Sequence, residues 1–284
     1  MRALLYTATT LPDAWFQLVY ALVKGDAPRN IYTIDKGSYV GQRRLEFPYV
    51  TVQIDLPGTR PLIPEIPPLL NIPAPVESME YVNDYFTRYL MGTELEKGET
   101  YIYGTWLAPG VERVIEQLAG APGNNQAAIS IGGWAPGEHN QVIREAAMGV
   151  VRRLMPKHQR DLEKLAGITA TCTDTDNFID PGTGQRDPAC LRVVDFRLDQ
   201  DNFLHMVVYF RSWDLWGGFP ANLAGLQLVK EYVGQAIGAH DGAIIASSKG
   251  LHIYDHAIDV AAQRLGMAGV GSMDDLVGWI GDQG

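Results

Sequence analysis

Cys190 is the residue of this sequence best suited to act as a nucleophile. It follows the turn Asp187-Pro188-Ala189 and directly precedes Leu191–Leu198, a run typical of a strand. A thiolate is a strong nucleophile, and a cysteine at the mouth of a strand after a proline turn is placed to use it. The alternative is a buried, inert cysteine, which is the usual state of an unpaired cysteine.

Two later segments carry polar side chains at spacings that suit ligand binding. The first is Arg211–Asn222, with the sequence RSWDLWGGFPAN, and the second is Leu251–Tyr254, with the sequence LHIY. His252 and Tyr254 are two residues apart, which places them on the same side of a strand.

These three segments resemble the thymidylate synthase family, which carries a Pro-x-Cys turn, an Arg-Ser-x-Asp-x-x-x-Gly-x-Pro-x-Asn segment and a His-x-Tyr element in this order. The resemblance covers the chain from about Glu80 onward and is strongest over Asp187–Tyr254. The forms DPACLR and RSWDLW are closer to the archaeal-type, phage and antibiotic-pathway branch than to the common bacterial and animal enzymes. The resemblance implies transfer of one carbon from 5,10-methylenetetrahydrofolate to carbon 5 of a pyrimidine nucleoside monophosphate.

By this resemblance, Cys190 adds to carbon 6 of the pyrimidine, which makes carbon 5 nucleophilic. Arg211 matches the arginine that holds the nucleotide phosphate. It is also the favoured cation beside the thiolate, with Arg192 as the competitor. Ser212 matches a hydroxyl that contacts the phosphate, and a strand-end cap is its alternative role.

The remaining motif residues are assigned to the base, the sugar and the folate. Asn222 matches the amide that hydrogen-bonds the base, and it favours a uracil nucleotide, because relatives that act on cytosine often carry an acidic residue there. His252 and Tyr254 match the pair that contacts the sugar hydroxyl; a satisfied surface histidine is the alternative for His252. Asp214 matches the carboxylate that receives the pterin ring, and Gly218 is assigned to the folate side. A structural aspartate that caps the following turn is the alternative for Asp214.

Upstream matches are fewer. Glu80, at a helix start, corresponds to the family's active-site glutamate, although a carboxylate is favoured in a first helical turn without any function. Tyr103, in Tyr103-Gly104, corresponds to the tyrosine whose phenol assists removal of the proton at carbon 5. Trp106 is expected to line the folate side, with a core position as the alternative.

The sequence also departs from the family pattern. Family members supply two phosphate-binding arginines from the partner subunit, whereas the matching stretch 124–129 has no arginine. Arg43 and Arg44, after the loop 36–42, are the candidates that replace them. A solvent-facing pair is the alternative.

The product is left open by the sequence. Many thymidylate synthases close a short apolar tail over the site, whereas this chain ends in WIGDQG. An open site favours water over hydride and so a 5-hydroxymethyl product from dUMP, dCMP or CMP. Methylation of dUMP to dTMP is preferred because Asn222 and the overall resemblance favour it. The other hypotheses are a non-catalytic nucleotide-binding homologue and a cysteine hydrolase using Cys190 with His252.

Composition limits the other classes of function. The 284 residues carry a net charge of −10, which disfavours a general nucleic-acid surface, and contain no apolar run long enough to cross a membrane. Without an export signal, Cys172 and Cys190 are expected as free thiols in a cytoplasmic protein. The cysteines and histidines show no metal-ligand spacing, so no metal is expected.

Local patterns predict the elements that position these residues. Alternation predicts strands at Ala3–Thr9, Arg44–Leu56, Leu191–Leu198, Phe203–Phe210 and Gly242–Tyr254. Leu191–Leu198 and Phe203–Phe210 are expected to form an antiparallel hairpin. Helical spacing predicts helices at Ala14–Lys24, Ser78–Gly92, Pro109–Ala119 and Asn222–Ile237. Pro57–Pro75 is expected to be a rigid crossing loop.

The whole chain, 1–284, is expected to be a single thymidylate synthase-like catalytic domain with a helical and loop insertion at about 138–185. The resemblance implies an α+β fold, with a mixed β-sheet backed by helices and the other sheet face forming a homodimer interface. The expected partners are a pyrimidine nucleoside monophosphate, a reduced folate and a second copy of the chain, without nucleic acid or membrane.

Overall fold

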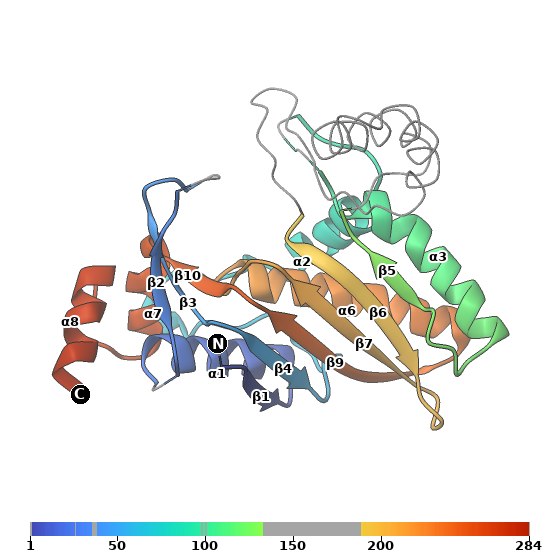
Figure 1. The fold of residues 1–284 in the computed structure, drawn as a ribbon, viewed down its shortest axis with the longest axis horizontal. Coiled ribbons are helices and arrows are strands. Elements are labelled where there is room, and N and C mark those ends of the chain that lie inside the picture. The colour runs from blue at the N-terminus through green and yellow to red at the C-terminus, as the bar shows by residue number, and fades with distance from the viewer. Residues whose placement is uncertain are drawn as a thin grey trace, which may run out of the picture. The chain divides into compact units, whose positions relative to one another are not determined.

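The computed structural model describes residues 2–25, 27–35, 39–97, 99, 101–132 and 189–283. Strands and helices combine in the predicted α+β arrangement (Figure 1). The strands are β1 (Leu4–Ala8), β2 (Asn30–Thr33), β3 (Arg43–Glu46), β4 (Val50–Ile54), β5 (Ala128–Ser130), β6 (Leu191–Leu198), β7 (Phe203–Phe210), β8 (Trp213–Asp214), β9 (His240–Ser248) and β10 (Leu251–Tyr254). The helices are α1 (Leu11–Val23), α2 (Met79–Asp84), α3 (Gly104–Gly120), α6 (Gly218–Ile237), α7 (Ile258–Arg264) and α8 (Met273–Gln283), with shorter or wider turns at η1 (Pro68–Leu70), η2 (Tyr85–Leu90) and η3 (Asp255–Ala257).

The described strands form two mixed sheets rather than the single one expected. The large sheet has the order β1-β4-β9-β7-β6-β5, and the small sheet has the order β2-β3-β10-β8. The predicted hairpin is confirmed, because β6 and β7 pair antiparallel from Leu191 opposite Phe210 to Leu198 opposite Leu204. The predicted insertion at about 138–185, together with Cys172, lies outside the described residues.

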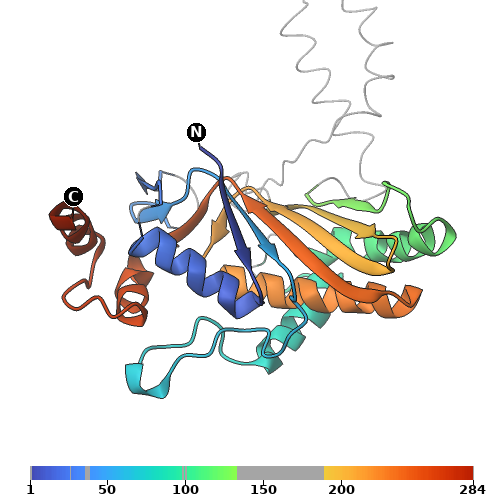
Figure 2. The ribbon, with the colours of Figure 1, turned by 90° about the horizontal axis from the view of Figure 1, so that it is seen from below.

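The large sheet has one covered face and, among the described residues, one open face. Figure 2 shows α1 and α6 on the same side of the strands. Side chains that point to this side are buried, as at Val52, Val208 and Ala246, and they form the core. Side chains on the other side remain exposed even where they are apolar, as at Leu5 and Val207. Alternation along each strand therefore separates a core face from an open face.

The predicted helices are present, but several begin earlier than expected. α1 begins at Leu11 because the Thr10 hydroxyl accepts the backbone N–H of Asp13 and a proline occupies its first turn. α3 begins at Gly104, five residues before the expected start, and contains Pro109 inside the helix. α6 begins at Gly218 because the carboxylate of Asp214 accepts the backbone N–H groups at its start.

The predicted helix at Ser78–Gly92 changes its winding halfway. Ser78 caps α2 by accepting the backbone N–H of Tyr81, and the chain then continues as the π-helix η2. The wider turn ends where the N–H of Met91 donates to the carbonyl of Phe86. The sequence pattern predicted the helix but not this wider turn, because both windings place residues four apart on nearly the same side.

Two predicted strands are each divided between the sheets. Arg44–Leu56 forms β3 and β4, and Gly242–Tyr254 forms β9 and β10. The chain also passes from the large to the small sheet between β7 and β8. Backbone hydrogen bonds hold these crossings side by side: the N–H of Trp213 donates to Gly250 over 2.9 Å, and the N–H of Phe47 donates to Leu251 over 3.0 Å.

We call the region where the two sheets part the seam. It is formed by 46–47, 190, 211–212 and 249–250, from four separate stretches of the chain. No helix among the described residues is long and apolar enough to cross a membrane.

Candidate active site

Cys190 lies at the seam, at the entrance to β6. It is a half-exposed cysteine outside any disulfide, and its carbonyl accepts the backbone N–H of Arg211 over 2.9 Å. Its own N–H donates to the phenol oxygen of Tyr101 over 3.4 Å, and the next N–H, of Leu191, donates to the phenol of Tyr103 over 3.2 Å. Two tyrosine hydroxyls therefore fix the backbone that carries the thiol.

These tyrosines stay protonated. Burial raises the pKa of Tyr89, Tyr101 and Tyr103 above the ordinary value, and a negative charge on Cys190 raises each pKa further. The phenols of Tyr101 and Tyr103 both accept backbone N–H groups, and a neutral phenol carries a proton as well as acceptor lone pairs. Tyr103 is therefore suited to act as a neutral hydrogen-bond donor rather than as a phenolate base.

The small sheet presents a polar face next to Cys190. In the strand register His252 lies opposite Asp214 on one side and Glu46 on the other, and Tyr254 lies opposite Arg44. Paired residues of neighbouring strands point to the same face, and residues two apart along a strand do so too. These five side chains therefore share one face, which we call the polar face.

His252 is the most buried member of the polar face. Its Nδ1–H donates to the carbonyl of Gly250 over 2.7 Å, and the residue is 1% exposed. Burial lowers the pKa of His252 to about 4, so the ring is neutral at physiological pH. With Nδ1 carrying the proton, Nε2 is an acceptor, and no donor among the described residues reaches it. A buried acceptor of this kind is completed by a donor from water or from a ligand, and the predicted contact of His252 with a sugar hydroxyl stays a prediction.

Tyr254 connects the polar face to Cys190. Its ring contacts that of His252 edge-on at 4.5 Å between centroids. Burial, the carboxylate of Asp214 and the charge of Cys190 raise the pKa of Tyr254 to about 12. The Tyr254 hydroxyl is thus a neutral hydrogen-bonding group. It lies near enough to Cys190 for the charge of a thiolate to raise its pKa.

Arg43 and Arg44, both proposed from the sequence, point to opposite faces of β3. Arg44 lies on the polar face, where its Nε contacts the carboxylate of Glu46 at 2.7 Å. Arg43 lies on the other face and pairs with Asp255 at 3.3 Å and with Asp274 of α8 at 2.5 Å. Arg44 therefore has the position expected of a nucleotide-binding cation, whereas Arg43 contacts the C-terminal helix.

Asp214 acts as the cap of the following turn, the alternative weighed from the sequence. Its Oδ1 accepts the N–H of Trp216, and its Oδ2 accepts those of Gly217 and Gly218, at 2.8 to 3.1 Å. A carboxylate has about four lone-pair sites, so an acceptor site remains after three N–H groups are bound. The cap is therefore compatible with a donor from a ligand, and the predicted contacts of Asp214 and Gly218 with the pterin stay predictions.

Asn222 lies one helical turn into α6 and is held from two sides. The indole Nε1–H of Trp213 donates to Asn222 Oδ1 over 2.9 Å, and Asn222 Nδ2 donates to the phenol oxygen of Tyr85 over 2.7 Å. Ser212 lies at the crossing between β7 and β8, half-exposed and next to Arg211. The predicted contacts of Asn222 with the base and of Ser212 with the phosphate stay predictions.

Glu80 is exposed in the first turn of α2. Trp106 of α3 is 7% exposed, and the centroid of its ring lies 6.4 Å from that of Tyr101. The roles of Glu80 and Trp106 stay predictions.

Several residues near the site were missed at the level of the sequence. They are Glu46, Tyr85, Tyr89, Tyr101 and Trp213. One signal was available: tyrosines stand at 81, 85 and 89, a spacing of four that places them on one side of a helix. Neighbouring rings of this row are stacked, with centroids 6.5 and 5.3 Å apart.

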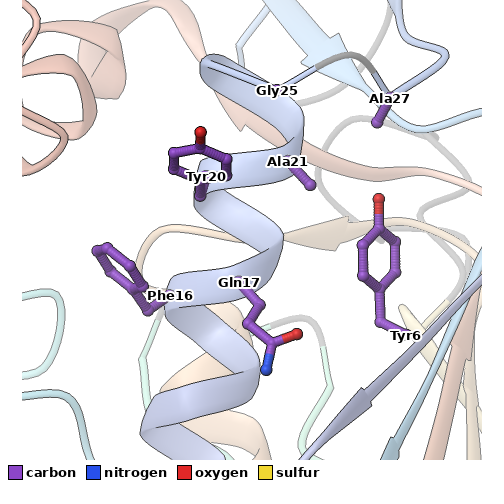
Figure 3. A pocket seen from close by; sticks show the side chains of 7 residues that line it. All are labelled: Tyr6, Phe16, Gln17, Tyr20, Ala21, Gly25 and Ala27. Atoms are coloured by element: carbon purple, nitrogen blue, oxygen red, sulfur yellow. The ribbon is translucent and has the colours of Figure 1, made fainter.

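A separate hollow lies between β1 and α1 and is lined mainly by apolar and aromatic side chains (Figure 3). Its lining residues are Tyr6, Phe16, Gln17, Tyr20, Ala21, Gly25 and Ala27. None of the predicted site residues belongs to it. No group of three histidine, cysteine or acidic residues that could hold a metal ion occurs in the described part of the chain.

Comparison with known proteins points to a transferase family. Residues 184–268 match the family model for thymidylate synthase, and this stretch contains Cys190, the RSWDLW motif and the His252–Tyr254 pair. The predicted resemblance to the thymidylate synthase family is thereby confirmed over this part of the chain.

The relatives agree with this assignment. The protein named "Putative thymidylate synthase" in Methanosarcina barkeri is 41% identical over 71 residues, and the one in Methanococcoides burtonii is 41% identical over 70 residues. Each alignment covers 25% of this chain and 32% of the relative, so the matched part spans about a third of the relatives' length.

Proposed function

We propose that the chain transfers a one-carbon unit from 5,10-methylenetetrahydrofolate to carbon 5 of dUMP and so makes dTMP. The observation that carries the proposal is that three separate stretches of the chain come together near Cys190. The backbone N–H of Arg211 donates to the carbonyl of Cys190, and the His252–Tyr254 pair lies on the polar face, where the charge of Cys190 raises the pKa of Tyr254. A nucleophile beside a cation and a ligand-binding face is what a covalent reaction on an anionic nucleotide requires.

In this proposal Cys190 is the nucleophile. Its thiolate adds to carbon 6, and the electron pair of the 5,6 double bond moves toward the carbonyl at carbon 4, which makes carbon 5 nucleophilic. The folate supplies the one-carbon unit and the hydride. Tyr103, held as a neutral phenol by burial, hydrogen-bonds a water molecule that takes the carbon 5 proton as tetrahydrofolate leaves the methylene carbon. Hydride transfer from this tetrahydrofolate to the methylene carbon, with expulsion of the thiolate from carbon 6, then restores the 5,6 double bond and leaves dihydrofolate.

The other residues hold the nucleotide. Arg211 and Ser212, adjacent at the seam, bind the phosphate, and Arg44 on the polar face adds a second cation. Nε2 of His252 accepts the sugar hydroxyl, and Tyr254 completes this contact. Asn222 binds the base edge. The remaining acceptor site of Asp214 is assigned to the pterin ring.

A second candidate function is 5-hydroxymethylation of the same nucleotide class. It is favoured by the neutral phenol of Tyr103 next to Cys190, since its proton can hydrogen-bond a water molecule. Water in place of hydride at the methylene carbon gives a hydroxymethyl group and leaves the folate as tetrahydrofolate.

The proposed active form is a homodimer formed through the open face of the large sheet. Apolar side chains on this face include Leu5, which is 75% exposed, and Val207, which is 40% exposed. An isologous pair of such faces removes this apolar surface from water.

The testing experiment is a turnover assay with 5,10-methylenetetrahydrofolate and dUMP, dCMP, UMP or CMP. Nucleotide mass and dihydrofolate absorbance are followed together. A gain of a methyl group with dihydrofolate formation supports the synthase, and a hydroxymethyl product without dihydrofolate supports the second candidate. Binding of nucleotide without turnover at any folate concentration contradicts both and selects a binding protein.

The Cys190→Ala variant is the control for the mechanism. We expect turnover to fall by at least about a thousandfold while nucleotide binding and the unfolding midpoint are retained, because only the nucleophile is removed. Turnover that survives this change contradicts the covalent mechanism.

A further inference from the structure

The carboxamide of Asn222 has a single orientation in its surroundings. The indole N–H of Trp213 can only donate, so the amide oxygen of Asn222 must face it, as the 2.9 Å contact requires. The amide nitrogen then faces Tyr85, whose phenol oxygen accepts a hydrogen bond over 2.7 Å. A rotated amide would set two N–H donors against each other at Trp213.

Neither partner of Asn222 is free to move away. The Trp213 ring is 3% exposed, lies parallel to Phe210 at 3.9 Å between centroids and touches Phe219 at 4.6 Å. The Tyr85 ring stacks on Tyr89 at 5.3 Å and packs against Gly225, where a methyl group would come within 2.8 Å of it. The two hydrogen bonds to Asn222 therefore come from rigid rings.

This rigidity matters for base recognition, because a side-chain amide that can rotate suits either pyrimidine. Uracil offers an N–H donor at position 3 and an acceptor at position 4, and cytosine offers the reverse. A carboxamide complements both edges if it can exchange its oxygen and nitrogen, and only one if it cannot. After the contacts to Trp213 and Tyr85, Asn222 keeps one N–H and one lone pair for a ligand.

We propose that Tyr85, together with Trp213, is a positioning residue that fixes the Asn222 amide and so sets the selectivity of the site for uracil over cytosine nucleotides. The inference rests on the nucleotide site proposed above and deepens it. Tyr85 acts through Asn222. Its phenol remains neutral, since burial raises its pKa well above the ordinary value, and so it continues to accept the amide N–H.

The test measures binding in the Cys190→Ala background, so that turnover does not interfere. Dissociation constants of dUMP and dCMP are determined by calorimetry for this protein and for the added changes Tyr85→Phe and Tyr81→Phe. Tyr85→Phe removes the phenol oxygen and keeps the ring stack. Tyr81 is 48% exposed and belongs to the same stack, so Tyr81→Phe is the matched control.

The expected result is a preference for dUMP in the Cys190→Ala protein that falls about five- to tenfold with Tyr85→Phe and is unchanged with Tyr81→Phe, in line with one hydrogen bond. Trp213→Phe, which removes the indole N–H and keeps an aromatic ring, should lower the preference as well.

Two outcomes overturn the inference. The first is a ratio of the dUMP and dCMP dissociation constants that is unchanged in both Tyr85→Phe and Trp213→Phe, which leaves the proposed function standing. The second is equal or stronger binding of dCMP by the Cys190→Ala protein.

Failure of the proposed function looks different. A Cys190→Ala protein that binds neither dUMP nor dCMP contradicts the nucleotide site itself, and the inference falls with it. A circular dichroism spectrum and an unfolding curve for each variant show that the fold is retained.

Discussion

At the scale of single residues, the site depends on groups held in one protonation state. His252 is kept neutral by burial, and the carbonyl of Gly250 fixes its proton on Nδ1. The tyrosines around Cys190 are kept neutral by burial as well. Neither His252 nor these tyrosines should change charge near neutral pH, so these groups should add little pH dependence to ligand binding there.

His252 should make the stability of the fold depend on acidic pH. Its pKa is lowered from near 6.5 to about 4, so between these values the unfolded chain binds a proton that the folded chain does not. The free energy of unfolding should therefore fall by about 1.4 kcal/mol for each pH unit of acidification in this window, and the contribution is fully present above it. Urea unfolding of the wild type and of His252→Gln from pH 4 to 8 measures this as a difference of slopes. Identical slopes would show that His252 titrates normally.

Asp214 should stabilise the start of α6 whether or not it binds folate. Asp214→Ala removes the acceptor of three backbone N–H groups and should lower the free energy of unfolding by about 1–2 kcal/mol. Asp214→Asn keeps one side-chain oxygen, which can still accept either the N–H groups of Gly217 and Gly218 or that of Trp216. The free energy of unfolding should therefore fall less than in Asp214→Ala. If the stability of Asp214→Asn is near wild type but its KM for folate rises, the carboxylate also serves the pterin; an unchanged KM leaves only the cap.

At the scale of elements, the contact between η2 and α6 determines where Tyr85 lies. Gly225 gives η2 room to approach, since a methyl group there would lie 2.8 Å from both Tyr85 Cδ1 and Leu90 Cδ1. Gly225 lies three residues after Asn222, so the same face of α6 receives the ring and presents the amide. The close approach of two helical segments therefore places a phenol on a predicted base-binding residue.

Gly225→Ala should destabilise the protein in spite of the better helix propensity of alanine. Overpacking costs about 1–3 kcal/mol, which exceeds the gain of about 0.5–1 kcal/mol from replacing a helical glycine. Gly234→Ala in the same helix is the control, since its methyl group would meet its nearest neighbour at an ordinary 3.6 Å and should stabilise. Thermal unfolding of both variants checks this. A stabilised Gly225→Ala protein would mean that η2 moves without cost.

At the scale of the whole molecule, the open face of the large sheet is the surface that bears on the proposed homodimer. The open face carries exposed apolar side chains on three of its strands: Leu5 on β1, Val193 on β6 and Val207 on β7. Exposed patches of this kind on a sheet favour association.

The proposed homodimer should be broken by a charge at the centre of this face. Val207→Asp places a carboxylate on the open face of β7, a strand that has a neighbouring strand on each side. We expect this change to shift the protein from dimer to monomer in sedimentation velocity at micromolar concentration. Leu69→Asp is the control, because Leu69 is 98% exposed in η1, away from the sheet strands. A wild type that sediments as a monomer would contradict the proposed dimer.

Much of the local structure could be predicted because it depends on neighbours along the chain. The hairpin of β6 and β7 follows from alternation and a polar turn, and α1 and α6 follow from helical spacing. The starts of α3 and α6 were predicted too late, since a proline suggested one start and the side chain of Asp214 caps the other. The π-turn at Tyr85 left no distinct signal because residues four apart align in either winding.

The sequence by itself determined the chemistry available here: a cysteine, an arginine with a serine, an amide, and a His-x-Tyr pair in an order that matches one family. The tertiary structure decided how these groups are used. It divides the strands between two sheets, separates Arg43 from Arg44 onto opposite faces, makes His252 neutral and places Tyr85 on Asn222. The physical reason is that strand pairing, burial and side-chain contacts between distant segments depend on the packed chain, and no local pattern encodes them.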